Sequence, residues 1–268
     1  MVEDGKSIAA ARPAATAVIL RDGPRGLEVF MVVRHQEIDF ASGALVFPGG
    51  KVDAQDADPA WSEFAPSAAG VPGLAFLVAA ARETFEEAGV VLARAVGERG
   101  LMDADAAHRL VATYRARLAA GSASFLDVVR RENLRLAADL MVPFAHWITP
   151  RTQPKRFDTH FLLVAAPVEQ LGAHDGGESV EGFWIAPSAA LREADAGTRT
   201  LLFPTHMNLL KLARFASVAE AVEAAHREPI VSVTPRVERT ATGRTLHIPA
   251  AAGYGITEWA VPMPKRLG

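Results

Sequence analysis

Short apolar runs bounded by turn residues predict strands along much of the chain. TAVILRD (16–22) and LEVFMVVRH (27–35) flank the turn signal GPRG and together predict a hairpin. A short strand is predicted within GALVFPGGKV (43–52), and the proline-containing stretch 53–73 predicts an ordered loop or short helical turns. Later strands are expected in MVPFAHWITP (141–150), FDTHFLLVAAP (157–167) and GFWIAP (182–187).

Apolar residues at steps of three and four predict helices between these strands. In LAFLVAAARETFEEAG (74–89) they form one face, and Gly89 is expected to end the helix. Helical spacing also covers 103–119 and 124–138, where SFLD (124–127) resembles a capping box, and we interpret this region as a helical insertion. The remaining elements are expected to be helices over 188–194 and 203–227 and a second hairpin formed by 229–240 and 244–255.

Strands and helices are mixed without regular alternation, which predicts an α/β or α+β sandwich. The chain has no internal repeat and no low-complexity linker. We therefore expect a single domain over 1–268, with a loose tail at 1–12, a helical insertion at 94–145, and a C-terminal helix and hairpin at 200–268.

Composition narrows the class of protein. Half of the 268 residues are hydrophobic, the net charge is −3 and the pI is about 6.3, so no basic field predicts nucleic acid or an anionic membrane as a partner. The absence of cysteine excludes disulfides and cysteine-ligated zinc. The N-terminus lacks a signal-peptide pattern, no apolar run has the length of a membrane span, and the last residues match no organelle address. We therefore expect a cytoplasmic enzyme.

The segment ARETFEEAGV (81–90) crowds three carboxylates onto one helix. Glu83, Glu86 and Glu87 stand at i, i+3 and i+4, so they share a face separate from the apolar one. Carboxylates this close raise one another's pKa unless a cation compensates, and Arg82 supplies only one positive charge. Such an oxygen-rich cluster suits Mg²⁺. The alternative from the residues alone is a solvated acidic helix face.

The residues around these glutamates resemble the signature of the Nudix hydrolases. That signature is a glycine, five residues, a glutamate, seven residues, and then Arg-Glu-apolar-x-Glu-Glu-x-Gly-apolar. Its second half stands here as RETFEEAGV (82–90), with Thr84 where an aliphatic residue is usual. Its first half stands as GKVDAQD (50–56), with Asp56 in place of the glutamate. Gly50 and Arg82 are 32 positions apart where the plain signature places them 14 apart, so 18 residues interrupt the box.

This resemblance implies a fold, an activity and a cofactor. The fold would be a Nudix α/β/α sandwich with a mixed β-sheet, plus the helical insertion. The activity would be hydrolysis of the diphosphate in a nucleoside diphosphate linked to another moiety, with Mg²⁺ or Mn²⁺ as cofactor. The interrupted box resembles the subgroup that contains the mammalian peroxisomal acyl-CoA diphosphatases. Further strings shared with that subgroup are GALVFPGGKVD (43–53), PFAHWITP (143–150), RFDTHFLL (156–163) and LHIPAAAGYG (246–255).

The resemblance also assigns roles to residues of the box. The implied metal ligands are Glu86, Glu87, Glu83 and the carbonyl of Gly50. Glu83 would be a further ligand or the catalytic base. Arg82 would be a catalytic residue that holds Glu83 through charge-assisted hydrogen bonds. Asp56 is expected to have only a structural role, because its side chain is shorter than that of the usual glutamate.

Nudix enzymes usually take a second acid from a later loop. The segment HDGGESVEGFW (174–184) offers Asp175, Glu178 and Glu181. Glu178 lies six residues before Trp184, the spacing at which some relatives carry a catalytic glutamate, and it ranks above Glu181. A polar hairpin tip is the alternative interpretation.

Three cations are the expected contacts to substrate phosphate: Arg34 at the end of the second predicted strand, Lys51 beside the glycine pair, and Arg156 before a predicted strand. An exposed partner in a salt bridge is the alternative for Arg34 and Lys51. His160 and His206 are expected to pack or to form hydrogen bonds, because this metal chemistry prefers oxygen ligands.

The partner is expected to be a small nucleotide-diphosphate substrate, with CoA or acyl-CoA as the first prediction. The insertion at 94–145 would then shape a pocket for the pantetheine or acyl part. ADP-ribose or another nucleotide sugar is the alternative within the enzyme class, and a non-catalytic Nudix-fold binding or regulatory module is the alternative from another class. The resemblance also leaves room for a homodimer, in which the apolar helix around 209–215 serves either the interface or the core.

Overall fold

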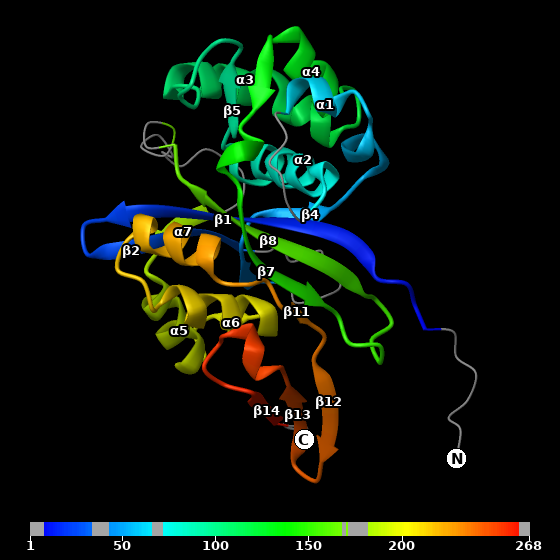
Figure 1. Cartoon of the computed structure of the whole chain (residues 1–268), viewed down its shortest axis with the longest axis vertical. Helices are drawn as coiled ribbons and strands as arrows, with labels where there is room; N and C mark the ends of the chain where they lie inside the picture. The colour runs from blue at the N-terminus through cyan, green and yellow to red at the C-terminus, as the bar shows by residue number, and fades with distance from the viewer. Residues whose placement is uncertain (1–7, 34–42, 66–71, 168–169, 171–181, 263–268) are drawn as a thin grey trace.

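The computed structural model describes residues 8–33, 43–65, 72–167, 170 and 182–262. A mixed sheet lies between two helical layers, and a small sheet extends the molecule beyond one of them (Figure 1). The strands of the central sheet are β1 (Arg12–Gly23), β2 (Gly26–Val33), β3 (Ala44–Val46), β4 (Gly49–Lys51), β7 (Val142–Ile148), β8 (Phe157–Ala165), β9 (Gly182–Ile185), β10 (Thr200–Leu201) and β11 (Ser232–Val233). Outside it, β5 (Ala93–Ala95) pairs with β6 (Leu134–Leu136), and the small sheet consists of β12 (Arg236–Thr240), β13 (Gly243–His247) and β14 (Glu258–Pro262).

Helices cover both faces of the central sheet. One layer contains α1 (Trp61–Phe64), α2 (Leu74–Glu83), α3 (Ala104–Ala119) and α4 (Phe125–Arg131), and the other contains α5 (Pro187–Asp195), α6 (Phe203–Leu212) and α7 (Val218–Arg227). Shorter turns are η1 (Ala54–Ala57), the π-helical turn η2 (Thr84–Ala88), η3 (Ala138–Leu140) and η4 (Ala250–Ala252). Among the described residues, no helix is both long and apolar enough to cross a bilayer. The layering confirms the predicted α/β/α sandwich.

The long strand β1 lies at the centre of the sheet. It pairs antiparallel with β2, which confirms the predicted hairpin, and parallel with β8. Strand β7 adds to β8 in the antiparallel direction, and β11 extends the sheet beyond β7. The short strand β4 also pairs with β1, with Gly49 opposite Thr16, so the predicted glycine pair lies beside the middle of the sheet.

Alternation along β1 divides the core into two halves. Ala17 and Ile19 pack toward α2 and the insertion, whereas Val18 and Leu20 pack toward α6 and α7. All four side chains are fully buried. A strand covered on both faces reads as a continuous apolar run, and this explains why AVIL (17–20) lacks polar positions. Strand β1 begins at Arg12, the last residue of the predicted loose tail, of which 1–7 lie outside the described residues.

The predicted insertion forms α3 and α4, but its second half needs a correction. The helix expected over 124–138 ends at Arg131, and the chain continues as β6. Asn133 has φ of +51°, a left-handed conformation that ends the helix and redirects the chain. Ser124 is the predicted N-cap: its hydroxyl oxygen accepts from the Asp127 N–H at 3.1 Å and donates to the Asp127 carboxylate at 2.7 Å.

The C-terminal part departs from the prediction in two places. The single helix expected over 203–227 is two helices, because Ser217 starts α7 as an N-cap by accepting from the Glu220 N–H. The predicted hairpin is β12–β13, to which β14 adds a third strand. Leu209 and Leu212 are fully buried in the half-core beneath α6 and therefore serve the core.

Candidate active site

The helix that carries the three glutamates changes its winding halfway through the acidic segment. It passes at Thr84 from α2 into the π-helical turn η2 and ends at Gly89, whose φ is +64°, as predicted. The Thr84 hydroxyl donates to the Ala80 carbonyl at 2.7 Å, so a polar side chain is satisfied at this fully buried position. Single π-helical turns are rare and occur frequently at functional sites.

Arg82 is the buried cation of the acidic cluster. It donates from Nε and Nη2 to both oxygens of Asp56, from Nη1 to Glu83 Oε1 and from Nη2 to the Lys51 carbonyl, each at 2.9 Å. Burial alone lowers the pKa of Arg82, but its hydrogen bonds to Asp56 and the charges of Glu83, Asp56 and Glu86 raise it above its ordinary value. Asp56 is thus a buried structural partner of Arg82, as its shorter side chain led us to expect.

Glu83 lies directly against Gly50. A Cβ atom at residue 50 would overlap Glu83 Oε1, so any residue other than glycine would require this carboxylate, which Arg82 holds, to shift. Burial, aided by Glu87 and Glu86 and opposed by Arg82, raises the pKa of Glu83 to about 7. This carboxyl can therefore exchange a proton near neutral pH.

The other two glutamates complete an acidic surface around Arg82. Glu87 accepts a hydrogen bond from the Gly49 N–H at 3.0 Å, which ties the π-helical turn to β4. Glu86 lies 3.5 Å from Arg82 Nη1, and burial raises its pKa. Arg82 divides its charge among several carboxylates, so the cluster has the donor set and the excess negative charge that suit a hard divalent ion.

A second arginine, which no sequence signal pointed to, contacts the same turn from the insertion. Arg115 of α3 donates from Nε to the Glu86 carbonyl and from Nη2 to the Glu87 carbonyl, both at 2.7 Å. Carbonyls at the end of a helix carry partial negative charge, so a guanidinium stabilises them. In the sequence, Arg115 is a polar residue between the apolar positions Leu110 and Leu118 of the same helix. The glutamates whose carbonyls it contacts lie 28 and 29 residues away, so local spacing does not identify it.

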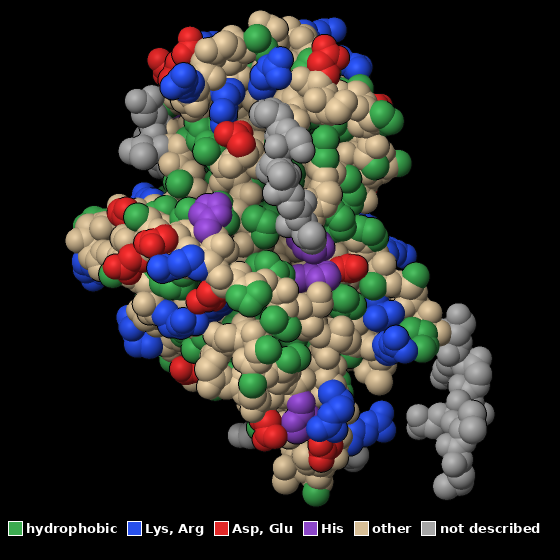
Figure 2. All heavy atoms as spheres, in the orientation of Figure 1, with side chains coloured by type: hydrophobic (Ala, Val, Ile, Leu, Met, Phe, Trp, Pro, Cys, Tyr) green, Lys and Arg blue, Asp and Glu red, His purple; other side chains and the backbone are tan. Residues whose placement is uncertain are grey.

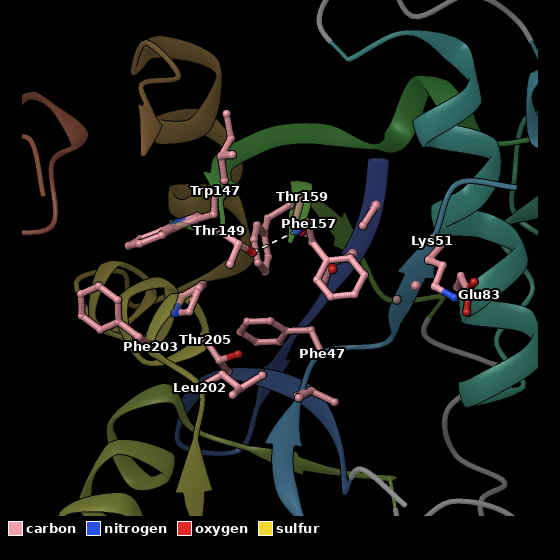
Figure 3. A pocket seen from close by; sticks show the side chains of 18 of the residues that line it. Phe47, Lys51, Glu83, Trp147, Thr149, Phe157, Thr159, Leu202, Phe203 and Thr205 are labelled. Carbon is pink, nitrogen blue, oxygen red and sulfur yellow. Dashed lines mark hydrogen bonds between the residues drawn. The ribbon is translucent and has the colours of Figure 1, made fainter. Parts of the chain in front are cut away.

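A cavity of about 1320 Å³ connects the acidic cluster with an apolar region. The three glutamates, Lys51 and β4 line one end. The other end is lined mainly by apolar side chains from several elements: Phe47, Trp147, Phe157, Phe161, Leu202, Phe203, Val237 and Leu246. Figure 3 shows Lys51 extending toward Glu83 at one end and the aromatic side chains gathered at the other. We call these the acidic end and the aromatic end.

Hydrogen bonds and ring contacts hold the aromatic end in place. Trp147 Nε1 donates to the Tyr254 hydroxyl at 2.8 Å, and that hydroxyl donates to Asn208 Oδ1 at 3.1 Å. The Trp147 ring meets the Phe203 ring edge-on, with centroids 5.5 Å apart. Burial raises the pKa of Tyr254, so its hydroxyl stays protonated and able to donate. This wall of the cavity is therefore preorganised by residues of the C-terminal part.

The expectation that the insertion shapes this pocket is wrong for the described residues. The structure describes all of 94–145, and none of these residues lines the cavity. The insertion instead packs its apolar stripe against the outer side of α2 and η2, with Leu110 and Tyr114 buried in that half-core. The pocket walls away from the glutamates come from α6, β7, β8 and the small sheet.

Of the other predicted site residues, one lines the cavity, one does not, and the rest lie outside the described residues. Lys51 lines the cavity. Arg156 is not among the lining residues, because its guanidinium donates to the backbone carbonyls of Thr149 at 3.0 Å and Ala9 at 2.7 Å. Arg34 and Glu178, together with Asp175 and Glu181, lie outside the described residues, and their roles stay predictions.

The two histidines singled out in the sequence both pack against rings. The His206 ring lies 4.4 Å from that of Trp259, and burial lowers its pKa. The His160 ring stacks on that of His146 with centroids 4.0 Å apart. Burial and the neighbouring His146 lower the pKa of His160 to about 4, against the opposing charge of Asp158.

Comparison with known proteins gives this geometry a family context. Residues 66–212 match the family model described as the NUDT19 Nudix domain. The chain is 30% identical over 241 residues to human "Acyl-coenzyme A diphosphatase NUDT19", covering 73% of this chain and 63% of that protein. It is 28% identical over 210 residues to "Putative nudix hydrolase 7" of Caenorhabditis elegans, covering 78% and 63%. The chain thus spans less than two thirds of the length of these curated relatives.

A solved structure is similar over most of the described fold. The NUDIX hydrolase from Alicyclobacillus acidocaldarius superposes with a TM-score of 0.65 at 28% sequence identity. The match covers 81% of this chain and 97% of that one.

Proposed function

The chain belongs to the Nudix family, and from this premise we propose that it is a metal-dependent diphosphatase whose substrate is CoA or an acyl-CoA. In this reaction a water oxygen bonds to one phosphorus of the diphosphate, and the bond from that phosphorus to the bridging oxygen breaks. The products are adenosine 3′,5′-bisphosphate and (acyl-)phosphopantetheine.

The observation that carries the proposal is the two-ended cavity. Its volume of about 1320 Å³ exceeds the range of roughly 300–1,000 Å³ typical of small-molecule sites. The acidic end suits a diphosphate with its metal, and the aromatic end suits a long apolar arm. CoA esters combine both features in one molecule, whereas a nucleotide sugar has no apolar arm to place against Trp147, Leu202 and Phe203.

The acidic end offers carboxylate oxygens, which are the ligand atoms that a hard divalent ion prefers. Glu83, Glu86 and Glu87 bring carboxylate oxygens together, and burial, aided by the neighbouring carboxylates and opposed by Arg82, raises the pKa values of Glu83 and Glu86. Mg²⁺ or Mn²⁺ would be held by Glu86 and Glu87, with Glu83 and the Gly50 carbonyl as further ligands. The bound ion would neutralise phosphate oxygens during the reaction.

Residues of the chain would prepare the attacking water. Glu83, with a pKa of about 7, is suited to take the proton of that water at Oε2, since Arg82 holds Oε1. Arg82 is then a positioning residue that acts through Glu83. Lys51 would contact a phosphate oxygen, and Arg34 and Glu178 keep their proposed roles as a phosphate contact and a second acid.

The test is hydrolysis in the presence of Mg²⁺ by the wild-type protein and the Glu86→Gln variant. The substrate panel contains CoA, acetyl-CoA, a long-chain acyl-CoA, ADP-ribose, NADH and nucleoside triphosphates. We expect cleavage of CoA and its esters by the wild type and its loss in the variant. Exposed Glu98 is the matched control, because Glu98→Gln changes the same functional group away from the cavity.

Two outcomes would contradict the proposal in different ways. Turnover of ADP-ribose alone would retain the Nudix reaction and reject the CoA substrate. No turnover of any substrate by folded protein, with either Mg²⁺ or Mn²⁺, would favour the non-catalytic binding module.

A further inference from the structure

A second group of side chains with metal-ligating atoms lies on the opposite face of the sheet from the cavity. Trp147 on β7 and Phe157 and Thr159 on β8 line the cavity. Successive side chains of a strand point to opposite faces, so His146, Asp158 and His160 project to the other face. In the register of the two strands His146 stands directly opposite His160.

The three side chains bring their ligand atoms together. His146 Nε2 contacts Asp158 Oδ1, and the two imidazole rings stack with 7° between their planes. One ligand atom from each residue lies within 4.8 Å of the other two. Figure 2 shows histidine side chains gathered beside an acidic one on this face, over β7 and β8.

Neighbouring residues support this group on two sides. The Ser232 hydroxyl on β11 lies 2.7 Å from His146 Nδ1, which fixes the ring so that Nε2 faces Asp158. The Phe76 ring of α2 covers His160 edge-on at a centroid distance of 4.6 Å. A hydrogen bond to the second ring nitrogen is the usual support of a histidine that binds a metal through the first.

We propose that His146, Asp158 and His160 form a binding site for a transition-metal dication such as Zn²⁺. Two imidazole nitrogens and one carboxylate oxygen are a known ligand set for zinc, with water in the fourth position of the tetrahedron. The side chains of His146 and Asp158 are 14% and 35% exposed, which leaves that position open to solvent. The ion would lie between His146 and Asp158 in place of their direct contact, and a rotation of the His160 ring out of the stack would direct its nitrogen to the ion.

This site is separate from the acidic cluster in position and in chemistry. Phe76, which covers His160, and Glu83 are seven residues apart, or about 10 Å of helix rise. Nitrogen-containing ligand sets favour zinc, copper and nickel, whereas the carboxylates of the acidic end favour Mg²⁺ and Mn²⁺. The bound ion would join β7 and β8 directly, and β11 through Ser232. The proposal is therefore independent of the proposed diphosphatase activity.

The experiment is calorimetric titration of the full chain with Zn²⁺ in excess Mg²⁺, which saturates the carboxylates of the acidic end. Co²⁺ is the second probe, because its visible absorption reports tetrahedral coordination. We expect one equivalent of Zn²⁺ to bind the wild type and the affinity to fall roughly tenfold or more in Asp158→Asn and in His160→Ala. Asp158→Asn keeps the size of a partly exposed side chain, so it reports binding even if His160→Ala fails to fold.

Two control variants identify the site among the described histidines. His226→Ala removes a histidine of α7 outside the proposed site, and it should leave the affinity unchanged. His247 lies 3.0 Å from Glu238 and 3.3 Å from Glu258, so it forms the main rival cluster. The proposal is overturned if the wild type binds no Zn²⁺, if Asp158→Asn binds it as tightly as the wild type, or if His247→Ala alone removes binding.

Discussion

The helical insertion and the C-terminal part flank the central sheet at opposite ends of the molecule, and they meet the cavity in different ways (Figure 1). The insertion lines none of the cavity in the described residues, yet its Arg115 holds the backbone of the two glutamates that we propose as metal ligands. The C-terminal part lines the aromatic end and contributes none of these glutamates. In the proposed enzyme, the insertion would support the backbone of the metal-binding end, and the C-terminal part would contact the rest of the substrate.

In the proposed enzyme, this difference would separate stability and metal binding from substrate recognition. Changes in the insertion should affect unfolding and the metal requirement with little effect on the choice of substrate. Changes in the C-terminal part should affect the choice of substrate with little effect on the metal. Variants in both regions test that division, and so do variants of the pair Asp56–Arg82, on which the acidic end depends.

The largest effect on stability is expected for Asp56→Ala. Removing this carboxylate leaves Arg82 buried without its bidentate partner, and breaking such a buried pair costs about 3–5 kcal/mol of unfolding free energy. Urea denaturation measures the change. Asp105→Ala, at an exposed position of α3, is the control and should stay within about 0.5 kcal/mol of the wild type. A loss as small as that of the control would show that Asp56 is not the anchor of Arg82.

A pair of leucine variants tests the division directly. Leu110→Ala in the insertion should lower the unfolding free energy by about 2–5 kcal/mol, because it leaves a cavity in the core. It should leave KM for a long-chain acyl-CoA unchanged. Leu202→Ala at the aromatic end should instead raise that KM about tenfold through lost apolar contact. Equal effects of the two variants on KM would contradict the assignment of separate roles.

The pH dependence of stability should reveal Glu83 in the metal-free protein. Its pKa is raised from an ordinary 4.5 to about 7, so between these values the folded chain binds one proton more than the unfolded chain. The contribution of Glu83 is fully present below about pH 4.5 and is lost as pH rises through 7, at about 1.4 kcal/mol per pH unit. Urea denaturation in EDTA from pH 5 to 8 measures this slope. Glu83→Gln should flatten it, and an unchanged slope in the variant would assign the proton to another group.

An effect as small as that of Leu202→Ala is expected for Arg115→Lys. Lysine keeps the charge but cannot donate to both carbonyls of the π-helical turn at once, so the glutamates should be held less firmly. The Mg²⁺ concentration for half-maximal activity should rise about tenfold, with KM for substrate at saturating Mg²⁺ unchanged. Arg109→Lys on the same helix is exposed and serves as the matched control. A change in substrate KM alone would place Arg115 in substrate binding instead.

The elements that could be predicted from the sequence are those with a strong local signal. The hairpin of β1 and β2, the glutamate helix with its stop at Gly89, and the Ser124 cap all follow from spacing and turn chemistry. The acidic cluster could be predicted because its residues lie within one helix. The buried pairing of Asp56 with Arg82 agrees with the structural role expected from its shorter side chain, although 26 positions separate the two residues.

The remaining features depend on contacts between distant segments. Arg115 reaches the glutamate turn across 28 and 29 residues, and nothing in its own helix marks it. The sequence on both sides of Ser217 has apolar residues at helical spacing, so periodicity alone predicted one helix. Ser217 acts as an N-cap and divides this segment into two helices. The aromatic end brings β7 together with α6 and with Tyr254, which lies 107 positions after Trp147. The local sequence around each of these residues therefore does not indicate that their side chains form one wall.

The most direct test of the account is Mn²⁺ binding, measured by electron paramagnetic resonance, in the same samples that are assayed for acyl-CoA hydrolysis. The wild type should bind Mn²⁺ and hydrolyse the substrate, and Leu202→Ala should bind Mn²⁺ equally well with a raised KM. Glu86→Gln should lose both Mn²⁺ binding and activity, the latter by a factor on the order of 10²–10³. Mn²⁺ binding and hydrolysis that survive in Glu86→Gln would contradict the claim that the metal and the diphosphate meet at the acidic end.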